Sequence, residues 1–307
     1  MKVLITGACG HIGSYIAQNI HKIKKIKEVI MIDNLKTEKY YSLFDLNTKI
    51  KFKFYKIDLS KQNIDDFKKI EYVIHCASHT NAQESFSAKK EMFRNNIGCM
   101  KNVLNFCIKN KSKLIHISSS SVYGKQVKIV YEDNDNLIKP QSPYAEIKIL
   151  EEKLLKKNKS KLNFISFRFG TIAGVSKGMR FHTAINKFCL NASLNKRILV
   201  YKTALNQYRP YLSLRDAFKI FKHCIEKNKF TNQTYNALSG NFTVKQIINI
   251  IKKYKRNLKI KLINAKIMNN LSYITSNKKI RKLGIKLNSK IGYDIHQTLS
   301  LFKNLKN

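Results

Sequence analysis

Three evenly spaced glycines follow the first apolar run of the chain and restrict what it can fold into. Residues 2–6 are mostly apolar, Gly7, Gly10 and Gly13 come next, and residues 14–20 continue at helical spacing. A strand, a glycine turn and a helix N-terminus form a cradle for a pyrophosphate group. Gly7 would permit the tight turn, Gly10 would leave room for the phosphate, and Gly13 would let the helix pack close to the strand. Glycines also serve plain turns, so the spacing alone leaves that alternative open.

An acidic residue at the end of the second apolar run strengthens the dinucleotide interpretation. Residues 28–32 resemble a strand, and Asp33 closes it twenty residues past Gly13. In a dinucleotide-binding fold such a carboxylate accepts hydrogen bonds from the ribose hydroxyls of the adenosine. It also repels a 2′-phosphate, so the predicted cofactor is NAD and not NADP. The alternative is an aspartate that caps a helix or a turn.

Strand-like and helix-like patterns alternate along the chain. The predicted strands are residues 2–6, 29–33, 51–56, 72–76, 113–118 and 163–169, and the predicted helices are residues 11–24, 63–68, 93–109, 143–158, 215–228 and 244–254. Such alternation is typical of α/β proteins and predicts a Rossmann-type, doubly wound parallel sheet. After Gly170 the pattern weakens, and we expect a smaller, largely helical C-terminal substrate lobe. The predicted NAD-binding domain is 1–168, with returns near 198–228, and the predicted lobe is 169–197 and 229–307.

A serine-rich strand end and a tyrosine–lysine pair predict the chemistry. Ser119 lies near the end of a predicted strand, and Tyr144 and Lys148 stand four residues apart on one face of a predicted helix. A tyrosine with its ordinary pKa of about 10 is a poor base at neutral pH. A lysine ammonium and a nicotinamide cation would stabilise its phenolate. With Ser119 bridging the substrate hydroxyl and the phenol, the trio is suited to removing a proton from a carbinol while hydride leaves to NAD.

Composition adds few constraints on function. The chain has 307 residues, enough for one large α/β domain and a smaller lobe, and its net charge is +40. The lysines are scattered, so we expect no specific nucleic-acid partner, although their field should attract an anionic substrate. We expect no membrane span, and six cysteines without paired spacing favour reduced thiols in a cytoplasmic protein. His75 and His79 lack a carboxylate framework, so no metal site is predicted.

These motifs resemble those of extended short-chain dehydrogenase/reductases of the NAD-dependent nucleotide-sugar epimerase/dehydratase family, and most of all UDP-galactose 4-epimerases. The resemblance covers nearly the whole chain and implies a nucleotide-diphosphate sugar as substrate and a homodimer formed through four helices. It implies catalytic roles for Ser119, Tyr144 and Lys148. The implied cofactor-binding residues are Gly7, Gly10, His11, Ile12, Gly13, Asp33, Asn34, Asp58, Leu59, Ala77, Ser78, Asn96, Tyr144 and Lys148. The candidate substrate-binding residues are Ser119, Thr171, Arg180 and Arg209.

Among these candidates, Arg209 lies in a segment that resembles the family's QxRDF motif, whose arginine grips the nucleotide diphosphate. Arg180 and His182 could contact a phosphate or a sugar, and the alternative is that both are solvated loop residues. Asn96 matches a structural or cofactor-side asparagine of the family.

Several positions depart from the family pattern. Ser120 and Ser121 stand where dehydratases carry an acidic pair, so no side chain there could eliminate water. Thr80 stands where epimerases often carry a lysine, and Thr171 stands where asparagine is frequent. The late RxGD motif is absent, and residues 266–273 occupy its region. These departures leave the cofactor and acid/base groups intact and leave the identity of the sugar open.

Three classes of function remain. The first is a nucleotide-sugar epimerase that acts at C4 through a transient 4-keto sugar. The second is a net NAD-dependent dehydrogenase or reductase of nucleotide sugars that uses the same trio. The third is a non-catalytic dinucleotide sensor, against which the retained Ser119, Tyr144 and Lys148 argue. The first two share a half reaction, but an epimerase recycles its bound NAD, whereas a net dehydrogenase must exchange or re-oxidise it. We expect the first.

Overall fold

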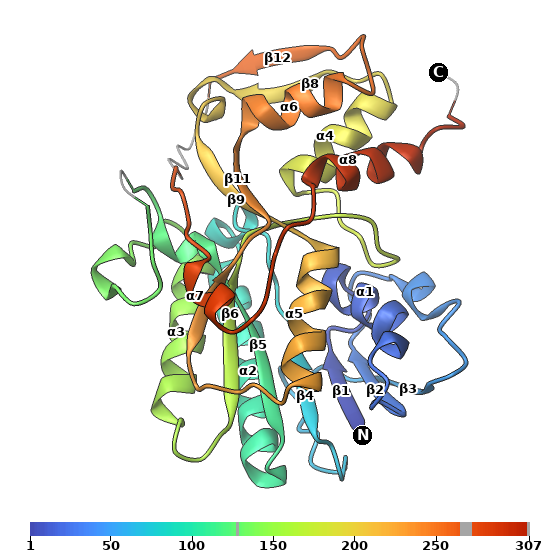
Figure 1. Ribbon diagram of the computed structural model, residues 1–307, viewed down its shortest axis with the longest axis vertical. Coiled ribbons are helices and arrows are strands. Elements are labelled where there is room, and N and C mark those ends of the chain that lie inside the picture. The colour runs from blue at the N-terminus through green and yellow to red at the C-terminus, as the bar shows by residue number, and fades with distance from the viewer. Residues whose placement is uncertain (127–128, 265–271, 306–307) are drawn as a thin grey trace.

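The centre of the molecule is a seven-stranded parallel sheet (Figure 1), seen in a computed structural model that describes residues 1–126, 129–264 and 272–305. Its strand order is β10-β6-β5-β4-β1-β2-β3. The strands are β1 (Lys2–Thr6), β2 (Glu28–Asp33), β3 (Lys51–Lys56), β4 (Tyr72–His75), β5 (Lys113–Ser119), β6 (Phe164–Phe169) and β10 (Thr234–Ala237). The predicted strands are therefore confirmed, each with ends within one residue of the expectation.

Helices cover both faces of this sheet (Figure 1). Helices α1 (His11–Asn19) and α5 (Leu214–Glu226) share a core with one face, and α2 (Lys89–Asn110) and α3 (Pro143–Lys157) share a core with the other. Within β1, Val3 and Ile5 join the first core and Leu4 joins the second. Successive side chains of a strand point to opposite faces, so a fully apolar strand is buried on both sides. This arrangement confirms the predicted Rossmann-type, doubly wound sheet.

The predicted helix over residues 63–68 is wrong. That segment forms turns, in which the Asn63 side chain accepts from the Asp65 N–H at 3.4 Å and Lys68 Nζ donates to the Asp65 carbonyl at 2.6 Å. Such local bonds from side chain to backbone compete with helix formation. Its apolar residues, Ile64 and Phe67, pack into the core beneath α2 without a helix. The helical pattern in the sequence therefore came from core contacts of a turn.

The later chain adds a second group of elements beyond the carboxyl ends of the sheet strands (Figure 1). Its helices are α4 (Ala184–Ser193), α6 (Val244–Lys252) and α8 (Ile291–Ser300), and α7 (Lys278–Lys282) lies near β10. One small sheet joins β7 (Thr171–Ala173), β9 (Tyr208–Ser213) and β11 (Gly240–Thr243), and another joins β8 (Ile198–Tyr201) and β12 (Ile260–Ile263). The two small sheets were not predicted. The predicted domain boundaries stay a prediction.

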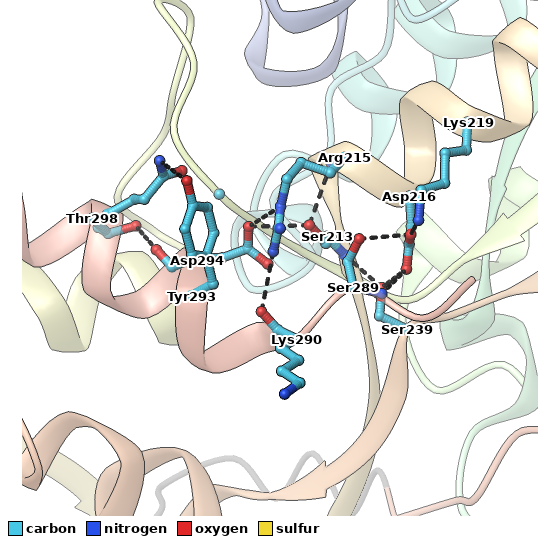
Figure 2. Close-up of polar contacts among 12 residues, drawn as sticks. Ser213, Arg215, Asp216, Lys219, Ser239, Ser289, Lys290, Tyr293, Asp294 and Thr298 are labelled. Atoms are coloured by element: carbon cyan, nitrogen blue, oxygen red, sulfur yellow. Dashed lines mark hydrogen bonds and ion pairs between the residues drawn. The ribbon is translucent and has the colours of Figure 1, made fainter. Parts of the chain in front are cut away.

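A polar junction ties α8 to the start of α5 (Figure 2). The Ser213 side chain caps α5 by accepting from the Arg215 N–H, and its hydroxyl donates to Asp294 Oδ1 at 3.0 Å. Arg215 Nε donates to the same oxygen at 3.3 Å, and its guanidinium lies 4.2 Å from the ring centre of Tyr293. Asp294 Oδ2 is buried without a hydrogen-bond partner in the described part of the chain. Burial accordingly raises the pKa of Asp294 to about 6.

Candidate active site

The glycine turn between β1 and α1 is sterically closed to any side chain at two positions. Gly7 has a φ of +63°, and a Cβ added there would lie 2.6 Å from the Ala77 nitrogen. A Cβ added at Gly13 would lie 2.2 Å from the Gly7 carbonyl oxygen, inside the turn itself. Gly10 has more space, since its Cβ would approach the same oxygen at 3.2 Å. The turn therefore presents bare backbone at the start of α1, which fits the phosphates of a dinucleotide.

Asp33 lies over this turn, as the sequence predicts. Its Oδ2 accepts from the Cys9 N–H and its Oδ1 accepts from the Leu35 N–H, both at 2.9 Å. These bonds fix the plane of the carboxylate, and each oxygen keeps a lone pair that can accept from a ribose hydroxyl. Burial and the Asp33 charge raise the pKa of the Cys9 thiol to about 12, so this cysteine is a neutral packing residue at neutral pH.

The other predicted cofactor residues line the same cavity, except Asn96, which lies behind the lining. Asn96 is buried and bonds twice to His79, accepting from its N–H at 2.8 Å and donating to its carbonyl at 3.0 Å. Asn96 therefore acts structurally, by ordering the loop that follows β4. In the same way, the Ala77 N–H donates to Thr6 Oγ1 at 3.3 Å. The further predicted cofactor residues on the cavity wall are His11, Ile12, Asn34, Asp58, Leu59 and Ser78.

Ser119 lies at the carboxyl end of β5, and Tyr144 and Lys148 of α3 line the same cavity. Pro143 begins α3 after Ser142, whose side chain accepts from the Ala145 N–H, and this cap places Tyr144 in the first turn. Lys148 Nζ lies 5.9 Å from the Tyr144 ring centre. All three residues line the cavity that also contains the glycine turn, and its volume is about 1190 Å³. The structure thus brings the predicted catalytic residues, and every predicted cofactor residue except Asn96, into one cavity.

The Lys148 ammonium donates hydrogen bonds to two acceptors. Its Nζ donates to the Ile117 carbonyl at 3.1 Å and to Glu151 Oε2 at 2.7 Å. Burial would lower the pKa of Lys148, but Glu151 and Tyr144 raise it above its usual value. Burial would raise the pKa of Glu151, but the Lys148 charge and the hydrogen bond from His116 lower it. Lys148 is therefore an ammonium at neutral pH, as the predicted chemistry requires.

The candidate substrate residues Thr171, Arg180 and Arg209 also line the cavity. Arg180 lies on the loop after β7, and its guanidinium donates to Thr80 Oγ1. Burial lowers the pKa of Arg180, and its Nε is buried without a hydrogen-bond partner among the described residues. His182 is exposed, and partial loss of water around its ring, together with the nearby Arg180 and Lys39 charges, lowers its pKa to about 4. This side of the cavity therefore carries positive charge that an anionic group could neutralise.

The Arg180 loop packs directly on the cofactor turn. The Gly178 N–H donates to Ser14 Oγ at 2.8 Å, and Ser176 Oγ donates to the His11 carbonyl at 2.8 Å. Lys39 Nζ donates to the Gly178 carbonyl at 2.8 Å. His11 itself donates from Nε2 to the Gly174 carbonyl at 2.9 Å, and burial lowers its pKa to about 3. Loop and turn are thus one unit, which places Arg180 beside the cofactor site.

Sequence reasoning missed several residues that shape this site. Glu151 contacts Lys148, and Tyr273 lines the cavity with its hydroxyl 3.2 Å from Ser120 Oγ. Behind the site, Glu152 forms a buried ion pair with Arg168 at 2.7 Å. Two adjacent glutamates on an otherwise amphipathic helix were the available signal for Glu151 and Glu152. The segment predicted to replace the RxGD motif lies, for residues 266–271, outside the described residues.

His75, the last residue of β4, belongs to the interior of the sheet. His75 is buried, and its Nδ1 lies 2.8 Å from Thr6 Oγ1. Burial lowers the pKa of His75 to about 3, so its imidazole is neutral. Within residues 1–126, 129–264 and 272–305, no three His, Cys, Asp or Glu side chains form a group able to hold a metal ion.

No helix of the same residues is long and apolar enough to cross a membrane.

Comparison with known proteins identifies the family. The sequence model of the NAD dependent epimerase/dehydratase family matches residues 3–237, and the chain belongs to that family. A dTDP-D-glucose 4,6-dehydratase from Dictyostelium discoideum is 30% identical over 272 residues, which are 81% of this chain and 62% of that protein. An ADP-L-glycero-D-manno-heptose-6-epimerase from Brachyspira hyodysenteriae is 27% identical over 251 residues, covering 78% of this chain and 76% of the relative.

Solved structures share the whole fold. A UDP-glucuronic acid 4-epimerase from Bacillus cereus superposes with a TM-score of 0.87, 24% identity and full coverage of both chains. A UDP-N-acetylglucosamine 4-epimerase from Methanobrevibacter ruminantium superposes with a TM-score of 0.86 and 24% identity, covering 98% of this chain and 97% of the other. Membership of an NAD-dependent family confirms the predicted cofactor, and the shared fold confirms the predicted fold class.

Proposed function

We propose that the protein is an NAD-dependent nucleotide-sugar epimerase that inverts C4 through a transient 4-keto sugar. The observation that carries the proposal is the convergence of the glycine turn, Ser119, Tyr144 and Lys148 on one cavity of about 1190 Å³. Small-molecule sites usually measure roughly 300–1,000 Å³. The larger cavity suits a dinucleotide and a nucleotide sugar side by side. Solved proteins that share the fold include two 4-epimerases of UDP-sugars, which supports the choice of C4.

The residues of the trio take separate roles in this proposal. Bound NAD would supply the hydride acceptor. The Tyr144 phenolate takes the proton of the C4 hydroxyl, and the Lys148 ammonium, 5.9 Å from the Tyr144 ring centre, stabilises the phenolate. Ser119 Oγ, which accepts from the Ser121 N–H at 3.2 Å, orients the same hydroxyl. Tyr144 then returns the proton to the oxygen after the keto sugar has turned its other face toward the cofactor.

Positive side chains that line the cavity would hold the diphosphate. Arg209 lines the cavity from β9, and Arg180 lines it from the loop that covers the glycine turn. Charge-assisted hydrogen bonds to phosphate oxygens are the strong class of such bonds. Either guanidinium could therefore anchor the nucleotide while the sugar rotates. The sugar can turn over only if the substrate is held through its nucleotide. Both arginines line the cavity, where they could hold the diphosphate in this way.

The carboxylates of the cavity favour epimerisation over dehydration. In the described part of the chain, those that line the cavity are Asp33, Asp58, Glu84 and Glu91. The two aspartates belong to the cofactor wall, and Glu91 pairs with Lys36 at 2.6 Å. Directly after Ser119 stand Ser120 and Ser121, which have no carboxylate to remove a proton for elimination. A net dehydrogenase remains the second candidate on the same trio.

A panel of UDP-, GDP-, TDP- and CDP-sugars tests the proposal. Sugar NMR and NADH absorbance are followed together after the protein has been loaded with NAD. An epimerase converts one sugar into its C4 epimer without net accumulation of NADH. Stoichiometric NADH would favour the dehydrogenase, and no turnover with any sugar would contradict both. The Tyr144→Phe variant is the control, because it removes only the acid/base oxygen and should lose about 10²–10⁴-fold in rate.

We also propose a homodimer and a cytoplasmic location. The outer surface of the α2–α3 pair exposes Phe93 and Leu150, 45% and 39% accessible, which a second copy could cover. All six cysteines are free thiols, which suits a reducing compartment. Light scattering of the purified protein tests the dimer. Fractionation of cells that express the tagged chain tests the location.

A further inference from the structure

A buried polar chain continues from Lys148 away from the cavity. Glu151 Oε2 lies 2.7 Å from Lys148 Nζ and 2.9 Å from His116 Nε2, so one oxygen takes two donors. His116 Nδ1 lies in turn 2.9 Å from Ser166 Oγ. Lys148, Glu151, His116 and Ser166 are 3%, 1%, 0% and 0% exposed. The chain links α3 to β5 and β6 and ends inside the sheet.

The chemistry of Glu151 fixes the direction of the two hydrogen bonds that it receives. An ionised carboxylate only accepts, so His116 Nε2 carries the hydrogen and donates it to Glu151. On its other side, His116 Nδ1 and the Ser166 hydroxyl share a hydrogen bond of 2.9 Å. His116 and Ser166 therefore hold the Glu151 carboxylate in one orientation from below. Lys148 holds it from above with a charged donor.

In the described part of the chain, Glu151 is the carboxylate that pairs with Lys148. The titratable groups that face the pair are Tyr144 on α3, His116 on β5, His75 and Cys76 at the end of β4, and Cys99 on α2. Burial lowers the pKa of His75 to about 3 and raises the pKa values of both thiols to about 12. These three side chains are thus uncharged at neutral pH. The Lys148 ammonium and the Glu151 carboxylate are in direct contact, 2.7 Å apart.

A lysine this deeply buried needs such a partner to stay protonated. Complete burial lowers a lysine pKa by up to about 3–5 units, whereas an opposite charge within hydrogen-bond distance favours the charged form by about 1–3 units. Without the carboxylate, Lys148 would give up its proton more easily. A neutral Lys148 amine would no longer stabilise the negative charge of the Tyr144 phenolate.

We propose that Glu151 is a positioning residue that keeps Lys148 protonated and aimed beneath Tyr144, and that His116 and Ser166 fix Glu151 for this task. The inference rests on the proposed function, since Tyr144 and Lys148 are the acid/base pair of that proposal. It extends the catalytic machinery by one buried layer, since Glu151, His116 and Ser166 lie outside the lining of the cavity. It also predicts that Glu151 acts on the reaction only through the charge of Lys148.

The direct test follows the protonation of Lys148 in the NAD-free protein. Lysine labelled with ¹³C at Cε reports the charge by NMR, and the Lys148 signal is assigned by its loss in Lys148→Met. In Glu151→Gln, which keeps the shape of the side chain, we expect the Lys148 titration to move about 1–3 units to lower pH. Glu132→Gln is the matched control, because Glu132 is another buried carboxylate and accepts from the Asn236 N–H at 2.6 Å. It should leave the Lys148 titration unchanged.

Kinetics then separate a positioning role from a merely structural one. We expect Glu151→Gln to lower kcat about 10–10³-fold at neutral pH with KM for the sugar nearly unchanged, and Glu151→Asp to recover part of the loss. The double variant Lys148→Met/Glu151→Gln should lose no more than Lys148→Met alone. This comparison also serves if Glu151→Gln alone does not fold, because the double variant buries no unpaired charge.

Two results would overturn the inference. One is an unchanged Lys148 titration in folded Glu151→Gln, whatever its activity. The other is a double variant far less active than Lys148→Met, which would make Glu151 a structural residue. Failure of the proposed function looks different: Tyr144→Phe would retain full turnover while the Lys148 titration still moved in Glu151→Gln.

Discussion

Replacing Gly13 by alanine should weaken NAD binding by an amount that the geometry of the turn predicts. The added Cβ would lie 2.2 Å from the Gly7 carbonyl oxygen and 2.8 Å from the Ala8 Cα, and both are backbone atoms that cannot rotate away. The turn would have to open to relieve the clash. Overpacking of this kind costs about 1–3 kcal/mol. Since about 1.4 kcal/mol is tenfold in affinity, we expect the Kd for NAD to rise roughly 5–150-fold.

The matched control is Gly292→Ala, which makes the same chemical change in the first turn of another helix. There the Cβ would meet Ile250 Cγ2 at 3.6 Å, an ordinary van der Waals distance. Titration calorimetry with NAD measures both variants, and thermal melting reports whether each is folded. If folded Gly13→Ala bound NAD as tightly as Gly292→Ala, the close-packed turn would not be the phosphate cradle, and the reasoning would be refuted.

Three further predictions follow from single side chains. Asp33→Ala should narrow the preference for NAD over NADP, as measured by calorimetry, and equal affinity of the unchanged protein for both would contradict the role of Asp33. Arg209→Ala should raise KM roughly 10–100-fold with a smaller effect on kcat, since a charge-assisted contact contributes about 1.5–3 kcal/mol; an unaltered KM would point to Arg180 as the diphosphate anchor. Asp294 gives a pH dependence, because burial raises its pKa from 3.8 unfolded to about 6 folded. The folded state therefore binds the proton more tightly, so the free energy of unfolding falls as pH rises from about 4 to 6, by roughly 3 kcal/mol at about 1.4 kcal/mol per unit. Asp294→Asn should remove this slope in urea titrations, and an identical slope in both proteins would assign it to other groups.

The features that the sequence predicted correctly are those whose cause lies in neighbouring residues. The glycine turn, the acid at the end of β2 and the tyrosine–lysine pair on α3 each need only a short segment to specify their geometry. Alternating apolar segments likewise predict strands buried on both faces, because a buried parallel strand must be apolar on both sides. For these parts, local pattern and three-dimensional structure agree.

The features that the sequence did not predict depend on contacts between distant segments. Glu151 meets His116 across 35 residues, and Arg180 meets Thr80 across 100. The turns at residues 63–68 imitate a helical pattern because Ile64 and Phe67 pack into the core from irregular backbone. The small sheets of the later chain pair β7 with β9 and β8 with β12, which only the assembled fold brings together. Periodicity within one segment carries no information about such pairings.

The central claim is that a carbon of a nucleotide sugar is oxidised and reduced within one closed site. Its most direct test is the turnover of the active nucleotide sugar in deuterium oxide, with the product read by NMR and mass spectrometry. The account predicts an inverted C4 that carries no solvent deuterium, because the hydrogen removed from that carbon is the one returned to it, while Tyr144 handles only the hydroxyl proton. Deuterium incorporated at the inverted carbon would show inversion by proton exchange and would contradict the account.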